Sequence, residues 1–250
     1  MKYSRFIAAC LLLICFIPFV NAQENNESEA NILYNRDRIG IVNINSNGFG
    51  AAYRQSKIKD AFKATFFEIN FSVYWDIKEE RVYSLLFPGY RPFKYAKLNE
   101  IFFLRGGYGN VYKITRKPSW GGVEIQLAYS FGPSICFAVP VYLYVSEDEN
   151  DIYSDAVLEK YDPEIHSSNN IRGRGPYLKG ITELKIYPGF YGNIGFYFEY
   201  GQYNSVVKGI EVGGMVNIFP IGVPVMADND SKNVFFSFYL NIIFGKRYNK

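Results

Sequence analysis

The segment NVFFSFYLNIIF, residues Asn233 to Phe244, alternates between two kinds of side chain. Its even positions are all apolar: Val234, Phe236, Phe238, Leu240, Ile242 and Phe244. The odd positions between them include Ser237, Tyr239 and Asn241. A period of two predicts a β-strand with one apolar face. Such a strand, at about 3.3 Å per residue and a tilt of about 40°, spans roughly 25–30 Å, close to the hydrocarbon thickness of a membrane.

A strand with an apolar outer face cannot stand alone in lipid, because its backbone N–H and C=O groups need partners on both edges. The segment therefore predicts a closed barrel built from similar strands. The composition agrees: 22 Tyr, 22 Phe and 22 Gly accompany a mean hydropathy of −0.09, the balance expected when lipid-facing and lumen-facing residues alternate. A soluble β-sandwich also alternates, but it buries its apolar faces between two sheets.

The same alternation recurs along the chain. It marks residues 39–45, 49–55, 63–75, 99–112, 123–131, 135–145, 179–187, 191–200, 206–218 and 233–244. Turn-forming residues separate these segments, among them Ser46-Asn47-Gly48, Gly132-Pro133 and Pro188-Gly189. The prediction is an all-β fold, a closed antiparallel transmembrane β-barrel of about ten strands, with a range of eight to twelve.

Ten strands raise a difficulty for two long connections. If both termini are periplasmic, the 76–97 loop is extracellular, whereas the longer 146–176 segment falls on the periplasmic side, where such barrels keep short turns. Either Gly132-Pro133 is a kink within one long strand and the count is wrong elsewhere, or the inner side carries additional structure. Within the second segment, Ser154 predicts the cap of a short helix over 155–161.

The N-terminus has the features of an export signal. Lys2 and Arg5 precede an apolar run over 6–20, and small residues favour cleavage after Ala22. A membrane anchor is the alternative, but the run is shorter than the ~20 apolar residues that a spanning helix needs. We therefore expect a signal peptide at 1–22, a flexible polar lead at 23–37, and a single barrel domain at 38–250 in the outer membrane.

Removal of the signal leaves Cys136 as the remaining cysteine, so an internal disulfide is not expected. The formal charge of the whole chain is only +3, which does not favour a nucleic-acid partner. No cofactor is expected either. The acidic run 147–151 lacks the glycine of an EF-hand loop, so it favours a solvated loop over a metal site.

Several short sequence motifs provide evidence that is independent of the apolar–polar alternation. They are Gly48-Phe49-Gly50, Lys78-Glu79, Lys97-Leu98-Asn99, Arg105-Gly106-Gly107-Tyr108-Gly109, Pro140-Val141-Tyr142-Leu143, Glu183-Leu184-Lys185-Ile186-Tyr187-Pro188-Gly189, Phe198-Glu199-Tyr200-Gly201, Glu211-Val212-Gly213 and Gly245-Lys246-Arg247. With these motifs the chain resembles an uncharacterised family of Gram-negative outer-membrane β-barrel proteins, over nearly the whole mature sequence. The resemblance implies a fold and a location, and no activity. Ala96 and Val139 depart from it, at positions where the family pattern has Gly and Lys.

Charged residues on the polar faces of the expected strands are the candidate site. They are Glu68, Arg105, Glu124, Glu183, Lys185, Glu199 and Glu211. Charges inside a narrow barrel are costly unless they are paired, so the residues predict a salt-bridged network that fills the lumen. The alternative is a path for protons, ions or solutes lined by carboxylates.

These features leave two classes of function open. The first is a non-enzymatic barrel that acts as a scaffold, a narrow channel or a subunit of a larger envelope assembly, with outer-membrane lipid and envelope proteins as partners. The second is a barrel enzyme acting on outer-membrane lipid or lipoglycan, for which His166 beside Ser167 and Ser168 is the candidate. Because this trio lies in a polar loop rather than on a rigid scaffold, a solvated loop histidine is the favoured interpretation.

Overall fold

The computed structural model describes residues 34–84, 89–115, 122–146, 155–167, 170–176, 179–201, 205–227 and 229–249. The expected signal peptide, the first part of the polar lead and the acidic run 147–151 lie outside the described residues. Within the described ranges no helix is both long and apolar enough to cross a membrane.

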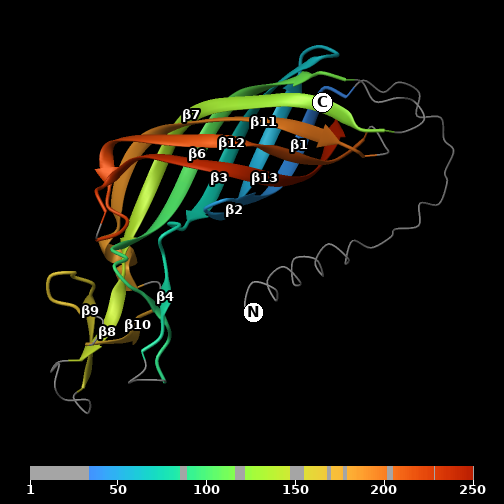
Figure 1. Ribbon diagram of the computed structural model, residues 1–250. Coiled ribbons are helices and arrows are strands. Elements are labelled where there is room, and N and C mark those ends of the chain that lie inside the picture. The colour runs from blue at the N-terminus through green and yellow to red at the C-terminus, as the bar shows by residue number, and fades with distance from the viewer. Residues whose placement is uncertain are drawn as a thin grey trace. The chain divides into compact units, whose positions relative to one another are not determined.

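Eight strands close into an antiparallel barrel (Figure 1). They are β1 (Arg36–Asn45), β2 (Gly48–Ile58), β3 (Lys63–Tyr74), β6 (Asn99–Lys113), β7 (Glu124–Pro140), β11 (Lys185–Glu199), β12 (Val206–Val223) and β13 (Lys232–Tyr248). Each strand pairs with its neighbour in this order, and β1 pairs with β13 to complete the ring. The predicted closed antiparallel barrel is therefore confirmed, at the lower limit of the expected strand number.

The count of ten was too high because two proline-glycine pairs do not end strands. Gly132-Pro133 lies inside β7, at the point where the hydrogen-bonded ladder to β6 lapses between the pairs Arg105↔Ser134 and Tyr108↔Phe131. Proline lacks a backbone N–H, so it is tolerated where no ladder bond is required. Likewise, Pro188 lies in β11 before the pairing with β12 begins.

The lower count resolves the placement of the long connections. The first and last described residues lie at one end of the barrel, where the backbone N–H of Asn35 donates to Asn249 Oδ1 at 3.0 Å. Because antiparallel strands alternate in direction, the β3–β6 and β7–β11 connections both lie at the opposite end. We call these the terminal end and the loop end. The turns β2–β3, β6–β7 and β11–β12 lie at the terminal end.

The alternation in β13 is reproduced from Val234 to Phe244. The even positions point outward, with exposed fractions from 40% at Leu240 to 65% at Phe238. The odd positions point inward, and Tyr239 is 4% exposed. The apolar face of this strand thus lies on the outside of a closed barrel rather than between two stacked sheets, which excludes the sandwich.

Two backbone positions at the loop end have special conformations. Gly48, which follows the tight turn at Ser46 and Asn47, has φ of 148°, and a Cβ there would lie 1.9 Å from the carbonyl oxygen of Val73. Glycine is required at this position. Ala96 has φ of 58°, in the left-handed region that glycine adopts most readily. A glycine at position 96 would therefore adopt this conformation with less strain than the alanine does.

Residues between the barrel strands build two small sheets at the loop end, which we call the extension. One has the order β10 (Ile171–Arg174), β8 (Tyr142–Ser146), β9 (Ala156–Lys160), and the other pairs β4 (Arg81–Val82) with β5 (Phe93–Lys94). The helix predicted over 155–161 is wrong, because most of that stretch forms β9 in pairing with β8. A 3-10 helix, η1 (Lys179–Glu183), leads back into the barrel.

The extension has a hydrophobic core of its own. Phe93, Leu143 and Ile171 are each no more than 1% exposed and pack together with Val141, Val145 and Tyr161. Backbone hydrogen bonds connect this core to the barrel: Val141 N–H donates to the carbonyl of Leu98 at 3.0 Å. Since β8 follows β7 after a single residue, the extension continues directly from the barrel wall.

The end of β3 is fastened to β13 by an ion pair at the loop end of the barrel. Lys232 donates to the carboxylate of Asp76, and the backbone N–H of Lys78 donates to Asp76 Oδ1 at 3.1 Å. Burial alone would raise the pKa of the Asp76 carboxyl, but these hydrogen bonds lower the pKa below its ordinary value of 3.8. The ionised form therefore stabilises the folded state.

This pKa shift predicts an acid-dependent loss of stability. A lowered carboxyl pKa contributes stability that is present above 3.8 and is lost as pH falls through the folded-state pKa. Asp76→Asn should therefore be less stable than the parent at pH 7, and the difference should vanish in strong acid. Urea unfolding at both pH values measures it. The exposed Asp230→Asn serves as the control, and an equal pH-dependent difference in that variant would contradict the assignment.

Candidate functional site

The middle of the barrel interior is organised around one arginine. Arg54 of β2 is 2% exposed, and it pairs with Glu68 of β3 through Nε at 2.7 Å and with Glu211 of β12 through Nη1 at 2.9 Å. Tyr239 donates its hydroxyl to Glu211 at 2.9 Å, and Asn241 donates to the same oxygen at 3.3 Å. All five side chains occupy inward positions of their strands. They form a fully buried, charge-assisted network.

A second buried cation lies in the same lumen. Arg105 of β6 is 2% exposed, and it donates to Asn217 at 2.7 Å, to Asn70 at 2.9 Å and to Ser72 at 2.8 Å. Its guanidinium also lies 4.8 Å from the ring centre of Phe103. Among the described residues Arg105 makes no ion pair. Neutral side-chain oxygens and the face of an aromatic ring therefore take the place of the water molecules that would surround an exposed guanidinium.

The terminal end of the lumen carries a third polar layer. Arg247 binds both carboxylate oxygens of Glu199, at 2.8 and 2.6 Å. Gln126 joins Glu199 to Glu124, and Lys113 pairs with Glu124 at 3.0 Å. A cavity of about 40 Å³ remains at this end. That volume admits no more than a few water molecules.

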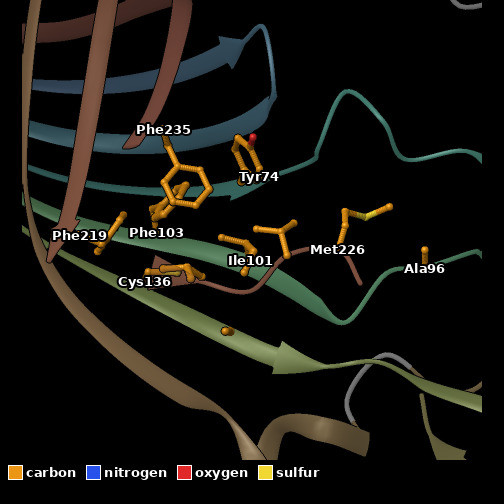
Figure 2. Close-up of a cluster of buried hydrophobic side chains, with 11 residues drawn as sticks. Tyr74, Ala96, Ile101, Phe103, Cys136, Phe219, Met226 and Phe235 are labelled. Carbon is orange, nitrogen blue, oxygen red and sulfur yellow. The ribbon is translucent and has the colours of Figure 1, made fainter. Parts of the chain in front are cut away.

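The loop end of the lumen is closed by apolar side chains, in contrast to the polar interior that the sequence predicts. Figure 2 shows this aromatic plug, in which the ring of Phe103 lies 5.6 Å from that of Phe219 and 5.3 Å from that of Phe235. Tyr74 packs edge-on against Phe235 at 5.1 Å. The plug is completed by Ala96, Ile101, Cys136, Ala138, Val223, Val225 and Met226. Together with the three polar layers, it fills the lumen.

The structure brings most of the candidate residues together. Glu68, Arg105, Glu124, Glu199 and Glu211 all lie in the lumen and are no more than 9% exposed. Glu183 and Lys185 do not join them. Glu183 belongs to η1, where it is exposed and accepts a hydrogen bond from Tyr142 at 2.5 Å. Lys185 is the first residue of β11 and is exposed at the loop end. Both were placed wrongly because the strand begins later than the alternation suggested.

Sequence reasoning missed the residue that joins the network together. Arg54 was not proposed as a site residue, although it alternates with Tyr53 and so falls on the inward face of its strand. Asn217 likewise falls on the inward face of its strand. Arg247 lies beyond Phe244, where the predicted last strand ends. A search for every polar residue at an inward position, rather than for carboxylates alone, would have found the complete set.

His166 differs from its expected setting. It is 3% exposed, so the expectation of a solvated loop histidine is wrong. The backbone N–H of Asp162 donates to Nδ1 at 3.0 Å, which leaves the ring proton on Nε2, and Nε2 lies 3.1 Å from a carboxylate oxygen of Glu159. The imidazole thus fastens the turn after β9. Ser168 of the same motif lies outside the described residues.

No protein family and no curated protein matches this chain. Several solved structures are similar to it, and they are Gram-negative outer-membrane β-barrels. Ail, the attachment invasion locus protein of Yersinia pestis, is 8% identical with a TM-score of 0.42, over 86% of this chain and 100% of that one. Neisserial surface protein A is 11% identical with a TM-score of 0.41, over 86% and 97%.

The outer membrane protein OprG from Pseudomonas aeruginosa is 11% identical with a TM-score of 0.34, over 86% of this chain and 94% of that one. At these TM-scores the similarity decides neither the fold nor the role of this chain. The class of this protein, a closed eight-stranded antiparallel β-barrel with a filled lumen, therefore rests on the strand pairing and the interior contacts of the chain itself.

The central network predicts a large effect from a small change. Glu211→Gln keeps the shape of the side chain but leaves Arg54 with one carboxylate, and breaking a buried ion pair typically costs about 3 kcal/mol or more. We expect a clear loss in the free energy of unfolding, measured by urea titration in detergent micelles. The matched variant Glu183→Gln changes an exposed carboxylate of the original candidate set. Equal effects of the two substitutions would contradict the importance of the central network.

Proposed function

We propose that this chain is an outer-membrane β-barrel with a sealed lumen, which acts as a non-enzymatic anchor and holds the extension at the membrane surface. The observation that supports this most directly is the apolar outer wall. Every barrel strand contributes a large apolar side chain that is at least 44% exposed: Val42, Phe49, Phe67, Tyr108, Phe131, Phe190, Val212 and Phe238. A continuous apolar wall of this kind is not stable in water, and it matches the surface that lipid requires.

The orientation follows from the lengths of the connections. Bacterial barrels place short turns on the periplasmic side and long loops outside. Since both long connections lie at the loop end, we infer that the extension faces the exterior and that both termini face the periplasm. Export through a cleaved signal peptide at residues 1–22 is part of this proposal.

The filled lumen favours an anchor over a channel. A conducting path would have to pass the aromatic plug, the Arg105 layer and the Arg54 network, all of which are made of buried side chains. An eight-stranded barrel is only wide enough for side chains to fill it. The folded extension then supplies the surface through which the protein would serve as a subunit or scaffold in an envelope assembly.

The alternative of a lipid-acting enzyme depended on His166. Its two ring nitrogens are both engaged within the extension, one by Asp162 and the other by Glu159. A general base needs a free nitrogen within reach of a nucleophile. The geometry therefore supports a non-enzymatic role for the extension.

A charge on the outer wall tests membrane insertion. Phe238→Arg should destabilise the protein by about 2–4 kcal/mol in a bilayer, because an arginine near the bilayer centre loses its hydration. In Ile165→Arg, a residue of the extension that is 67% exposed is changed in the same way, and the expected effect is about 0.5 kcal/mol or less. Urea unfolding in phosphatidylcholine vesicles measures both. Two equally mild effects would contradict insertion of the wall.

The sealed lumen predicts that the barrel does not conduct ions across a planar bilayer. The purified barrel in a planar bilayer should show no conductance steps above the leak current, because the interior layers leave no continuous water path. Phe103→Ala should remain silent as well, since the Arg54 and Arg105 layers persist beneath the plug. Reproducible steps from the parent protein would refute the anchor proposal in favour of the narrow channel.

A further inference from the structure

We propose that a pocket at the loop end binds the phosphate group of a membrane lipid whose acyl chains lie along the barrel wall. The pocket has a volume of about 410 Å³ and lies between the outer surface of the barrel and the extension. This inference rests on the proposed membrane location and adds a specific ligand to it. Its two sides differ in chemistry, and each matches one part of such a lipid.

The barrel side of the pocket is apolar. Phe49, Val73 and Phe102 line it from β2, β3 and β6, together with Trp75 just beyond β3. Phe49 is 52% exposed and Trp75 is 41% exposed, and their rings meet edge to face at 5.4 Å. These outward residues belong to the same wall that Phe71 and Phe67 continue toward the terminal end. An acyl chain placed here would leave the pocket directly along lipid-facing surface.

The extension side of the pocket is basic. Its lining includes Arg81, Arg91, Lys94 and Arg174, against a single carboxylate, Glu100. That carboxylate is already neutralised, because Glu100 accepts from Arg174 at 2.7 Å and from Lys97 at 2.5 Å. Lys94 pairs with Glu79, which also accepts from Lys97 at 2.7 Å.

Two of these cations are left with their charge uncompensated. The side chains of Arg81 and Arg91 are exposed, and within the described part of the chain neither forms an ion pair. An arginine guanidinium presents several N–H donors in a fixed plane, which suits the oxygens of a phosphate. The pocket thus places two guanidinium groups that can bind an anion beside an apolar surface that can contact hydrocarbon.

Backbone contacts fix the segments that carry these arginines before any ligand arrives. Arg81 pairs with Lys94 across β4 and β5, and the carbonyl of Arg91 accepts from the backbone N–H of Arg174 at 3.1 Å. A Cβ on Gly173 would lie 2.6 Å from the same carbonyl, so the two segments are packed as closely as the backbone allows. A site formed in advance loses less conformational entropy when it binds.

The position of the pocket favours a lipid over a soluble anion or an acidic peptide. It lies at the height where the apolar wall gives way to charged residues, which is the level of lipid headgroups at a membrane surface. In the proposed orientation this level belongs to the outer leaflet of the outer membrane, where the lipid is a phosphorylated, multiply acylated glycolipid. We therefore take diphosphorylated lipid A as the probe.

Trp75 provides a reporter inside the pocket. The chain has two tryptophans, and Trp120→Phe leaves Trp75 as the sole emitter. The full mature barrel in dodecyl maltoside is titrated with diphosphorylated lipid A, and Trp75 emission should change in a saturable way. In Arg81→Gln/Arg91→Gln the affinity should fall about tenfold or more, because each basic side chain near an anionic lipid contributes substantially to binding.

The control is a charge-matched pair at the terminal end. Lys208→Gln/Lys246→Gln removes two exposed lysines from the other end of the barrel and should leave the titration unchanged. Equal affinity of the arginine variant and the parent would overturn the proposal. The proposal would also be overturned if phosphatidylcholine alone gave the saturable change in Trp75 emission, or if millimolar inorganic phosphate displaced the lipid. A saturable change with an acidic peptide and none with lipid A would overturn it as well.

The same preparation separates this inference from the proposed function. An aliquot of each detergent-solubilised sample is first tested for insertion into vesicles, and the remainder is used for the titration. Protein that inserts but does not bind lipid A overturns the lipid site alone. Protein that fails to insert overturns the membrane location, and the lipid site with it.

Discussion

The pairing of β1 with β13 is the constraint on which the rest of the structure depends. It aligns Val42 with Ile242 in an unbroken antiparallel register and removes the two free edges that an open sheet would have. A wall that faces lipid must satisfy its backbone hydrogen bonds internally, and only a closed ring achieves this. Closure with eight strands also fixes the width of the lumen, so that side chains must fill it. The composition of the interior follows from that width.

The interior meets this requirement in two different ways. Toward the loop end it is packed like the core of a soluble protein, with the rings of Phe103, Phe219 and Phe235 in contact. Toward the middle it holds buried charge, and Arg54 is stabilised there by two carboxylates. Buried ion pairs contribute less net stability than apolar packing of equal volume, since desolvation offsets much of their attraction. The contacts of Glu211 join β12 to Arg54 of β2 and to Tyr239 and Asn241 of β13, so a shift in the register of these strands would leave buried charges unpaired.

The sequence was sufficient for the wall but not for the connections. Strict alternation identified β13 and β3 because one face of each meets the outside and the other meets the lumen, so every position reports its environment. It failed at Pro133 and Pro188, because a proline inside a strand normally signals its end, and the lapse in the ladder that tolerates Pro133 is a property of the neighbouring strand. Glu183 was misplaced for a different reason, because the alternation extends into η1 before β11 begins. The short strands of the extension carry no period long enough to detect, and the burial of His166 depends on contacts within that fold.

The single residue between β7 and β8 has a mechanical consequence. Val141 alone separates a 17-residue wall strand from the central strand of the three-stranded sheet. A pull on that sheet is directed along the axis of β7, and the hydrogen bonds that join β7 to β6 and β11 run across that axis. They would bear the load in shear, many at once, rather than opening one after another. In the proposed orientation, a partner that binds the extension would therefore pull on the whole wall, and through the wall on the surrounding bilayer.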